Sequence, residues 1–309
     1  AYVVTLRVSD PQGKSTSTTV TVTIGKGAPV LTLDYPADGG FFAWGDAVPY
    51  RYSATDAEDG DQIVCENLSW IFGLGHDSHA HPLESRAQEC EGTMDTPADA
   101  VEHGDTEKLY GAVVANYTDG GADGVEPATT TLSTVLNVFN QEAEHANVIE
   151  NGERQSDGTA NAGASIVFAE GGHLAYTPVN FTGIEGVSAR AQGAGTVELR
   201  FDAADAAPFA TATVTGDAWS DTAFTGADGE AVAFPTGTGT LHVSGSAGLQ
   251  LDTLNFDGPG VTEVVAPEPE KTLIPVEQVS MGMYSLGPWT EDVGLEPVLE
   301  RLAEIGYEN

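Results

Sequence analysis

The stretch Phe139-Asn140-Gln141-Glu142-Ala143-Glu144 opens a segment that closes with Leu249-Gln250-Leu251-Asp252-Thr253-Leu254-Asn255-Phe256. Between these two stretches lie short runs of β-forming residues separated by Gly, Asp and Thr turns, at 165–169, 187–191, 196–201, 210–215, 239–243 and, less distinctly, 218–224. Nothing in the segment has the spacing of a long amphipathic helix. Many short strands joined by turn residues predict a β-sandwich or jelly roll over residues 139–258.

Three carboxylates mark the two ends of this segment. In an extended first strand, Glu142 and Glu144 share one face because side chains alternate with a period of two. By the same rule, Asp252 shares a face with Leu254 and Phe256 in the last strand. A carboxylate on a half-buried face needs a partner, and a hard cation with oxygen ligands is the simplest one. The pattern therefore predicts a cation between the first and last strands.

Two further stretches, Gly171-Gly172-His173-Leu174-Ala175-Tyr176 and Thr215-Gly216-Asp217-Ala218-Trp219, lie in order between the terminal ones. Together the four stretches resemble carbohydrate-binding module family 6, and the resemblance covers about the whole segment. It implies a structural calcium held by Glu142, Glu144 and Asp252. It also implies a sugar clamped between two aromatic positions beside an amide, which here are His173, Trp219 and Gln250. His173 stands where the family has Tyr or Trp, and Gln250 where it has Asn.

Trp219 has two interpretations. As a functional residue it stacks on a pyranose ring, whose C–H bonds meet the negative face of the indole. As a structural residue it fills space beneath a loop, and this alternative stays open.

Composition narrows the class of partner. The 309 residues carry a formal net charge of −36 with only 11 Lys and Arg. Nucleic acid and anionic membranes are poor partners for such a surface. The same charge fits either a salty habitat or an ordinary acidic secreted protein. No apolar run reaches the ~18 residues of a membrane-spanning helix.

The two cysteines, Cys65 and Cys90, fall in one small segment. In a β-rich chain they predict a disulfide and hence a secreted or cell-surface protein, with two buried free thiols as the alternative. A bridge requires their Cα atoms to lie within ~4.4–6.8 Å.

The flanking regions divide into four parts. Residues 1–25 form two alternating runs around Asp10-Pro11-Gln12-Gly13 and resemble the last hairpin of a PKD-type repeat. Residues 28–138 resemble an immunoglobulin-like β-sandwich. Residues 259–274 are rich in Pro and acid and predict an extended linker. Residues 275–309 resemble the first βα unit of a sugar isomerase/epimerase barrel, a truncated piece of a fold that needs ~250 residues.

The densest group of metal-type donors is His76-Asp77-Ser78-His79-Ala80-His81. If this stretch is extended, His79 and His81 point the same way, and imidazole with carboxylate suits zinc, copper or nickel. The alternative is a polar loop whose imidazoles bond to the backbone and nearby carboxylates. A metal site predicts at least two imidazole nitrogens within about 4 Å of each other without metal.

No motif for nucleophilic catalysis or phosphate binding occurs in the chain. The sequence thus predicts an all-β protein of tandem sandwiches that is not itself an enzyme. Its expected role is monomeric, calcium-supported binding of a polysaccharide or oligosaccharide, as an accessory segment of a larger exported carbohydrate-active enzyme. The rival interpretations are a purely structural spacer or interaction protein, and a metal site at His76, His79 and His81.

Overall fold

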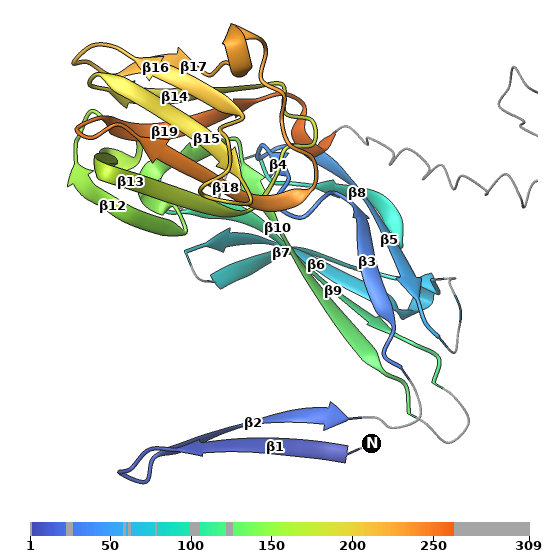
Figure 1. Ribbon diagram of the computed structural model, residues 1–309. Helices are drawn as coiled ribbons and strands as arrows, with labels where there is room; N and C mark the ends of the chain where they lie inside the picture. Colours follow the sequence, from blue (N-terminus) through green and yellow to red (C-terminus); the bar gives the residue numbers. More distant parts are fainter. Residues whose placement is uncertain are drawn as a thin grey trace, which may run out of the picture. The chain divides into compact units, whose positions relative to one another are not determined.

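The computed structural model describes residues 2–22, 27–57, 60, 63–77, 79–98, 106–121 and 126–262. The chain divides into one compact unit, Ala1–Val265, and a second unit, Ala266–Asn309. The second unit lies outside the described residues, and with it the predicted βα unit and all of the predicted linker beyond residue 262. In the described residues the regular elements are β-strands and short 3-10 turns, which confirms the all-β fold class (Figure 1). No helix in this part of the chain has the length and apolar character needed to cross a membrane.

The N-terminal hairpin pairs β1 (Tyr2–Ser9) with β2 (Ser15–Val22) in antiparallel register, as predicted. Its turn is fixed by Asp10, whose Oδ1 accepts hydrogen bonds from the backbone N–H groups of Gln12 and Lys14. This Asx-type turn satisfies backbone donors locally, which is why Asp favours such positions.

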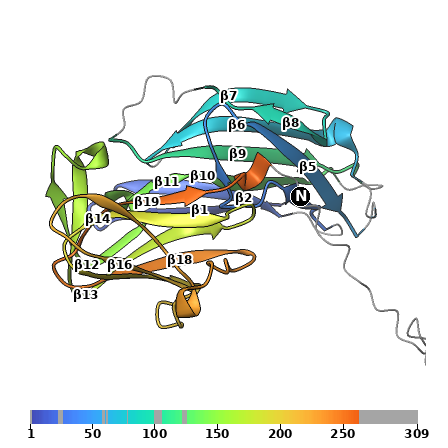
Figure 2. The ribbon, with the colours of Figure 1, turned by 90° about the horizontal axis from the view of Figure 1, so that it is seen from above.

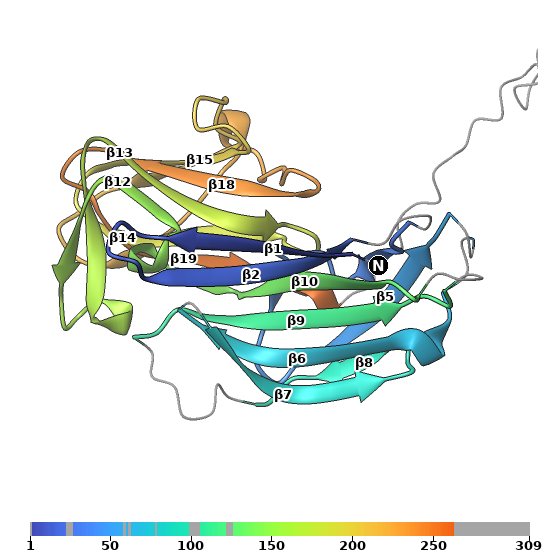
Figure 3. The same cartoon turned by 90° about the horizontal axis from the view of Figure 1, so that it is seen from below.

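Residues 28–138 form two sheets, each of antiparallel strands apart from one parallel pair. One sheet has the order β3-β5-β8, with bounds Val30–Tyr35, Ala47–Thr55 and Glu91–Asp95. The other has the order β4-β10-β9-β6-β7, with bounds Phe41–Phe42, Thr129–Val138, Leu109–Thr118, Leu68–His76 and His79–Ala87 (Figure 3). Alternating buried residues from both sheets form one core that includes Tyr50, Trp70, Phe72 and Leu136. The predicted sandwich is confirmed, and its immunoglobulin-like classification stays a prediction.

Residues 139–262, here called the module, form a nine-stranded assembly around the long strand β13 (Ala164–Asn180) (Figures 1 and 2). The order is β16-β15-β18-β13-β19-β14-β17, and β11 pairs with β19 while β12 pairs with β13. The bounds of the other strands are Asn140–Glu142 (β11), Val148–Ser156 (β12), Gly186–Gln192 (β14), Gly195–Phe201 (β15), Ala210–Val214 (β16), Ser220–Ala223 (β17), Thr238–Gly245 (β18) and Gln250–Asp257 (β19).

Strand β13 closes the module because its two halves pair with different strands. Ile166 and Val167 pair with β19, whereas residues from His173 onward pair with β18. A long strand that changes partners in this way turns a corner between two packed sheets. The first and last strands of the module, β11 and β19, pair directly in antiparallel register.

Strand β4 lies between the two hydrophobic cores. Phe41 and Phe42 are both fully buried, but Phe41 packs in the core of the module and Phe42 in the core of residues 28–138. Adjacent residues of a strand point to opposite faces, so one dipeptide serves both cores. The ring of Phe41 lies 4.5 Å from that of Phe256, 6.1 Å from Phe139 and 6.3 Å from Phe181 (centroid distances).

Polar contacts reinforce this junction. The backbone N–H of Asn180 donates to the carbonyl of Gly39 at 2.9 Å, and Asn137 Nδ2 donates to the carbonyl of Pro178 at 2.8 Å. The boundary at residue 139 is therefore crossed by both apolar packing and hydrogen bonds.

Candidate functional site

The predicted cation ligands depart from regular strand alternation. Strand β11 ends at Glu142, and the chain then forms the 3-10 turn Ala143–His145, which carries Glu144. The prediction that Glu142 and Glu144 share a strand face is therefore wrong. Ala143 explains the turn, because it is fully buried in the core of the module and the chain bends to place it there.

Asp252 also departs from simple alternation. Arg190 is opposite Thr253 while Ala191 is opposite Leu251, so Asp252 is the extra residue of a β-bulge in β19. The bulge places Leu251 in the core with Leu254 and Phe256, and the prediction that Asp252 shares their face is wrong. A bulge redirects a side chain in this way without ending the strand.

The redirected carboxylate is completely buried yet only half satisfied. One oxygen, Oδ2, accepts hydrogen bonds from Arg190 Nε at 2.7 Å and from the backbone N–H of Asn161 at 3.0 Å. Its other oxygen, Oδ1, is buried and accepts no hydrogen bond from the described residues. Both carboxylate oxygens of Glu144 are in the same condition. Such groups are costly when left without a partner.

Burial opposes ionisation of both carboxylates. Burial raises the pKa of Glu144, its own backbone N–H and Arg154 lower it, and the charge of Asp252 raises it further. Burial likewise raises the pKa of Asp252, against the lowering effect of Asn161 and Arg190. Burial also raises the pKa of Tyr176, and the charges of Glu142 and Glu144 add to that rise. The orphaned oxygens therefore fit a hard cation, which takes carboxylate and carbonyl ligands.

Glu142 lies at the edge of this cluster. Its backbone carbonyl accepts a hydrogen bond from the hydroxyl of Tyr176 at 3.2 Å. Glu142 lines a hollow of about 530 Å³. The other residues that line it include Trp44, Lys108, Gln141, His145 and Asn161. No local sequence pattern predicts this hollow, because residues from both sandwiches line it.

Two of the three predicted sugar-binding residues, Trp219 and Gln250, lie at the ends of strands that are separated by one strand. Trp219 precedes β17 and is half-buried, with its Nε1 donating to Thr159 Oγ1 at 3.0 Å and the guanidinium of Arg190 5.4 Å from its ring centroid. Gln250 opens β19, and its Oε1 accepts a hydrogen bond from Gln192 Nε2 at 2.6 Å. Strand β14 lies between β17 and β19, so it connects the two positions.

A small hollow of about 250 Å³ adjoins the amide pair. It is lined by Gln192, Gly193, Asp217, Gly248 and Gln250. Asp217 and Gln192 were missed by the sequence reasoning. Asp217 could have been identified from its position two residues before Trp219. Gln192 could not, because only the pairing of β14 with β19 brings it beside Gln250.

His173 lies elsewhere in the module. It is opposite Glu150 and Ser244 in the sheet, and its Nε2 is 2.8 Å from His242 Nδ1. Burial lowers the pKa of His173, and the neighbouring His242 lowers it further. Among the described contacts, none joins His173 to Trp219 or Gln250.

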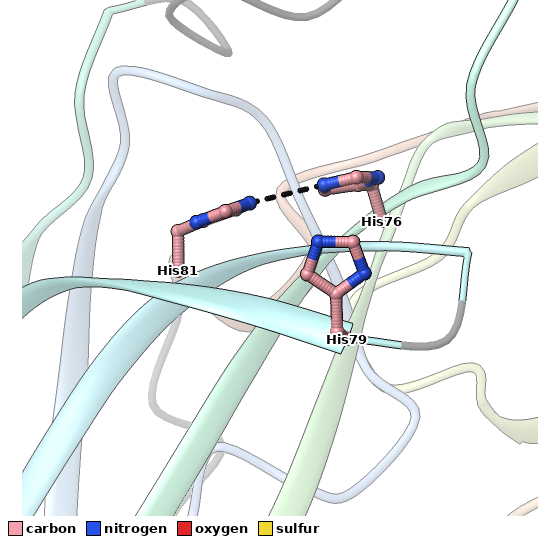
Figure 4. Close-up of side chains that lie close together, drawn as sticks. All are labelled: His76, His79 and His81. Carbon is pink, nitrogen blue, oxygen red and sulfur yellow. Dashed lines mark hydrogen bonds between the residues drawn. The ribbon is translucent and has the colours of Figure 1, made fainter.

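His76, His79 and His81 come together at the end of the β6–β7 hairpin. One ligand nitrogen from each of His76, His79 and His81 lies within 4.8 Å of the others. His76 Nε2 and His81 Nε2 are 3.1 Å apart (Figure 4). His79 and His81 lie in strand β7, and the predicted proximity of two imidazole nitrogens is confirmed.

The predicted disulfide is present. Cys65 and Cys90 are bonded, with their Cα atoms 5.3 Å apart. The bond ties the 3-10 turn Cys65–Asn67, which precedes β6, to the segment between β7 and β8. It therefore anchors the far end of the same hairpin that carries the histidines.

Comparison with known proteins finds similar solved structures over part of the chain. The sequence matches no family model and no curated protein. Similar solved structures include a CBM6 module from Clostridium stercorarium in complex with cellobiose, at 20% identity over 38% of this chain and 92% of that chain, with a TM-score of 0.33. A family 6 carbohydrate-binding module from Clostridium cellulolyticum in complex with xylose matches at 21% identity over 38% of this chain and 95% of that chain, with a TM-score of 0.32.

A longer match is a glycoside hydrolase family 43 arabinoxylan arabinofuranohydrolase from Bacillus subtilis in complex with cellotetraose. It is 14% identical over 72% of this chain and 54% of that chain, with a TM-score of 0.36. At TM-scores this low the likenesses carry no functional argument, and the proposals below rest on the chain's own residues.

Proposed function

We propose that the module binds a neutral glycan at the hollow beside Gln192 and Gln250. The observation that carries the proposal is the pair of amides at this hollow, joined at 2.6 Å and adjoined by Asp217. An amide offers both donors and an acceptor, and a carboxylate adds acceptors, which suits hydroxyls that donate and accept at once. A concave site with a few placed polar groups is what small-ligand recognition requires.

Trp219 supplies the apolar part of this site. Its ring is half-buried and held by Thr159 and Arg190, so it is ordered before a ligand arrives. Pre-ordering lowers the conformational entropy lost on binding. The exposed part of the indole offers its face or edge to the C–H groups of a sugar. On this proposal His173 is not part of the sugar site.

We further propose that a calcium ion is held by Glu144 and Asp252, with Glu142 at its edge. The support is Asp252 Oδ1 and the two carboxylate oxygens of Glu144, which are buried and accept no hydrogen bond from another described residue. Calcium would supply a hard, positively charged centre that stabilises the folded module by binding it alone. The ion pair between Arg190 and Asp252 Oδ2 leaves Oδ1 as the oxygen for the cation.

The proposed role is that of an exported, non-catalytic accessory segment. The disulfide supports export, because such bonds persist in oxidising compartments. The alternative role is that of a rigid spacer. The packing of Phe41 across the junction favours this role, because it fixes the two sandwiches together.

Titration of the protein with a panel of soluble oligosaccharides, by calorimetry in saturating Ca²⁺, tests the proposal. We expect at least one neutral oligosaccharide to bind, and Gln250→Ala or Trp219→Ala to weaken it about tenfold or more, the effect of a lost contact of ~1.4 kcal/mol. His173→Ala is the matched control, at a half-buried position on another strand, and should leave affinity unchanged. Absence of binding across the panel supports the spacer, and a loss with His173→Ala alone would move the site to β13.

A further inference from the structure

The hairpin of β6 and β7 places three imidazoles on one face. His76 is directly opposite His79, and His81 is opposite Leu74, two residues back along β6. Directly opposed side chains have Cβ atoms ~4.5–5.5 Å apart, and residues two apart on one strand point the same way. The pairing therefore requires all three side chains to project from the same end of the hairpin.

The nitrogens are already near the spacing that a metal needs. Ligand nitrogens ~2.0–2.1 Å from a tetrahedral zinc are ~3.3 Å from one another. The contact between His76 Nε2 and His81 Nε2, at 3.1 Å, is close to one edge of that tetrahedron. The third ring, His79, has its centroid 4.0 Å from that of His76 and 5.0 Å from that of His81. His79 and His81 are exposed, so small rotations of their side chains complete the arrangement (Figure 4).

The backbone around the histidines is fixed by its neighbours. The N–H of Asp77 donates to the carbonyl of Lys108 at 3.1 Å, and the hydroxyl of Tyr110 donates to the carbonyl of His79 at 3.4 Å. Asp77 Oδ2 lies 3.7 Å from His76 Nδ1, on the far side of the ring from the Nε2 that faces His81. This separation is longer than a hydrogen bond, so Asp77 contributes a negative charge near the ring and does not fix its orientation.

A polar hairpin with no metal is the competing explanation. It accounts for one contact between two imidazoles, because one ring donates and the other accepts. It does not require the third imidazole to lie with the other two. That observation favours a ligand shared by all three rings.

We infer that His76, His79 and His81 bind a divalent transition metal ion, with zinc as the reference occupant. An all-imidazole donor set selects zinc, nickel or copper over calcium and magnesium, which take oxygen ligands. Three protein ligands leave one coordination position for water or for an atom of an incoming ligand. The site lies in the first sandwich and is independent of the glycan and calcium proposals for the module.

Calorimetric titration of the full chain with Zn²⁺ tests the inference, after removal of metals with a chelator and in saturating Ca²⁺. We expect a single class of Zn²⁺ sites, unaffected by Ca²⁺. His81→Asn should weaken binding by at least the ~10- to 100-fold typical of losing an outer-shell partner, and the double variant His79→Asn with His81→Asn should abolish it. Both positions are exposed, so the metal-free variants should keep the melting temperature of the parent.

The double variant His173→Asn with His242→Asn is the matched control. It removes the other adjacent pair of imidazoles, whose nitrogens are 2.8 Å apart, and should leave Zn²⁺ binding unchanged. The inference is overturned if the parent chain binds no Zn²⁺, if binding survives the loss of His79 and His81, or if the control variant loses it.

Discussion

Phe41→Ala should destabilise the module although residue 41 belongs to the first sandwich. The ring is fully buried and contacts Phe139, Phe181 and Phe256. Truncating a buried Phe to Ala costs about 3–5 kcal/mol, from lost transfer free energy and from the cavity left behind. Phe42→Ala is the matched control, because the next residue is equally buried and points into the other core.

Hydrogen exchange read by mass spectrometry distinguishes the two cores. Every 1.4 kcal/mol is tenfold, so 3–5 kcal/mol predicts exchange about 140- to 3,700-fold faster where opening is cooperative. We expect Phe41→Ala to accelerate exchange in β13 and β19, and Phe42→Ala to accelerate it in β6 and β9. Phe41→Leu should fall between Phe41→Ala and the parent, which guards against a variant that fails to fold.

Two results would refute this reasoning. If Phe41→Ala left β19 unchanged, the aromatic contacts across the junction would contribute nothing to the module. If both Ala variants accelerated all four strands equally, the two sandwiches would unfold as one unit and the division into two cores would have no energetic meaning.

Three further outcomes are expected. Chelation of Ca²⁺ should lower the melting temperature of the module, because it removes a ligand that binds only the folded state. Glu144→Ala should abolish this sensitivity to chelator. If the variant responded as strongly as the parent, the ion would have to lie elsewhere. In chelator, stability should rise as pH falls from 7 toward the ordinary carboxylate range, because the raised pKa values of Glu144 and Asp252 make the folded state bind protons first. Saturating Ca²⁺ should reverse that slope, and Glu144→Gln should flatten it in equilibrium urea unfolding at several pH values. Reduction of Cys65–Cys90, a separation of 25 residues, should lower the free energy of unfolding by about 3.5 kcal/mol, and a thiol that alkylates before reduction would contradict the bridge.

The strands were predictable because their signal is local. The predicted runs at 187–191, 196–201, 210–215 and 239–243 fall on β14, β15, β16 and β18, where β-forming residues are bounded by turns. Strand β12 was missed, since Val148–Ser156 is polar and exposed along most of its length and shows no alternation. Strand β7 was missed as a regular strand for the same reason.

The candidate site was predictable in composition but not in geometry. The carboxylates were identified, yet Glu144 sits on a 3-10 turn and Asp252 on a bulge, and both are breaks in the alternation on which the prediction depended. Bulges and short turns are decided by packing, here by Ala143 and Leu251 entering the core. No local pattern encodes that preference. Phe41 was missed because its partners are more than 95 residues away in sequence.

The negative charge of the chain is consistent with all of the proposed ligands. With a net charge of −36, the chain has few cations, and in the module Arg190 and Arg200 are paired with Asp252 at 2.7 Å and with Glu198 at 2.6 Å. These guanidiniums are partly buried, so they neutralise carboxylates inside the fold and leave the surface acidic. An acidic surface raises the local concentration of metal cations, repels polyanions and is indifferent to neutral sugars. The proposed site at Glu144 offers carboxylate oxygens, which suit calcium, and the proposed site at His76 offers imidazole nitrogens, which suit zinc. Ligand chemistry therefore determines which metal ion each site binds, although the same negative electrostatic potential attracts both ions.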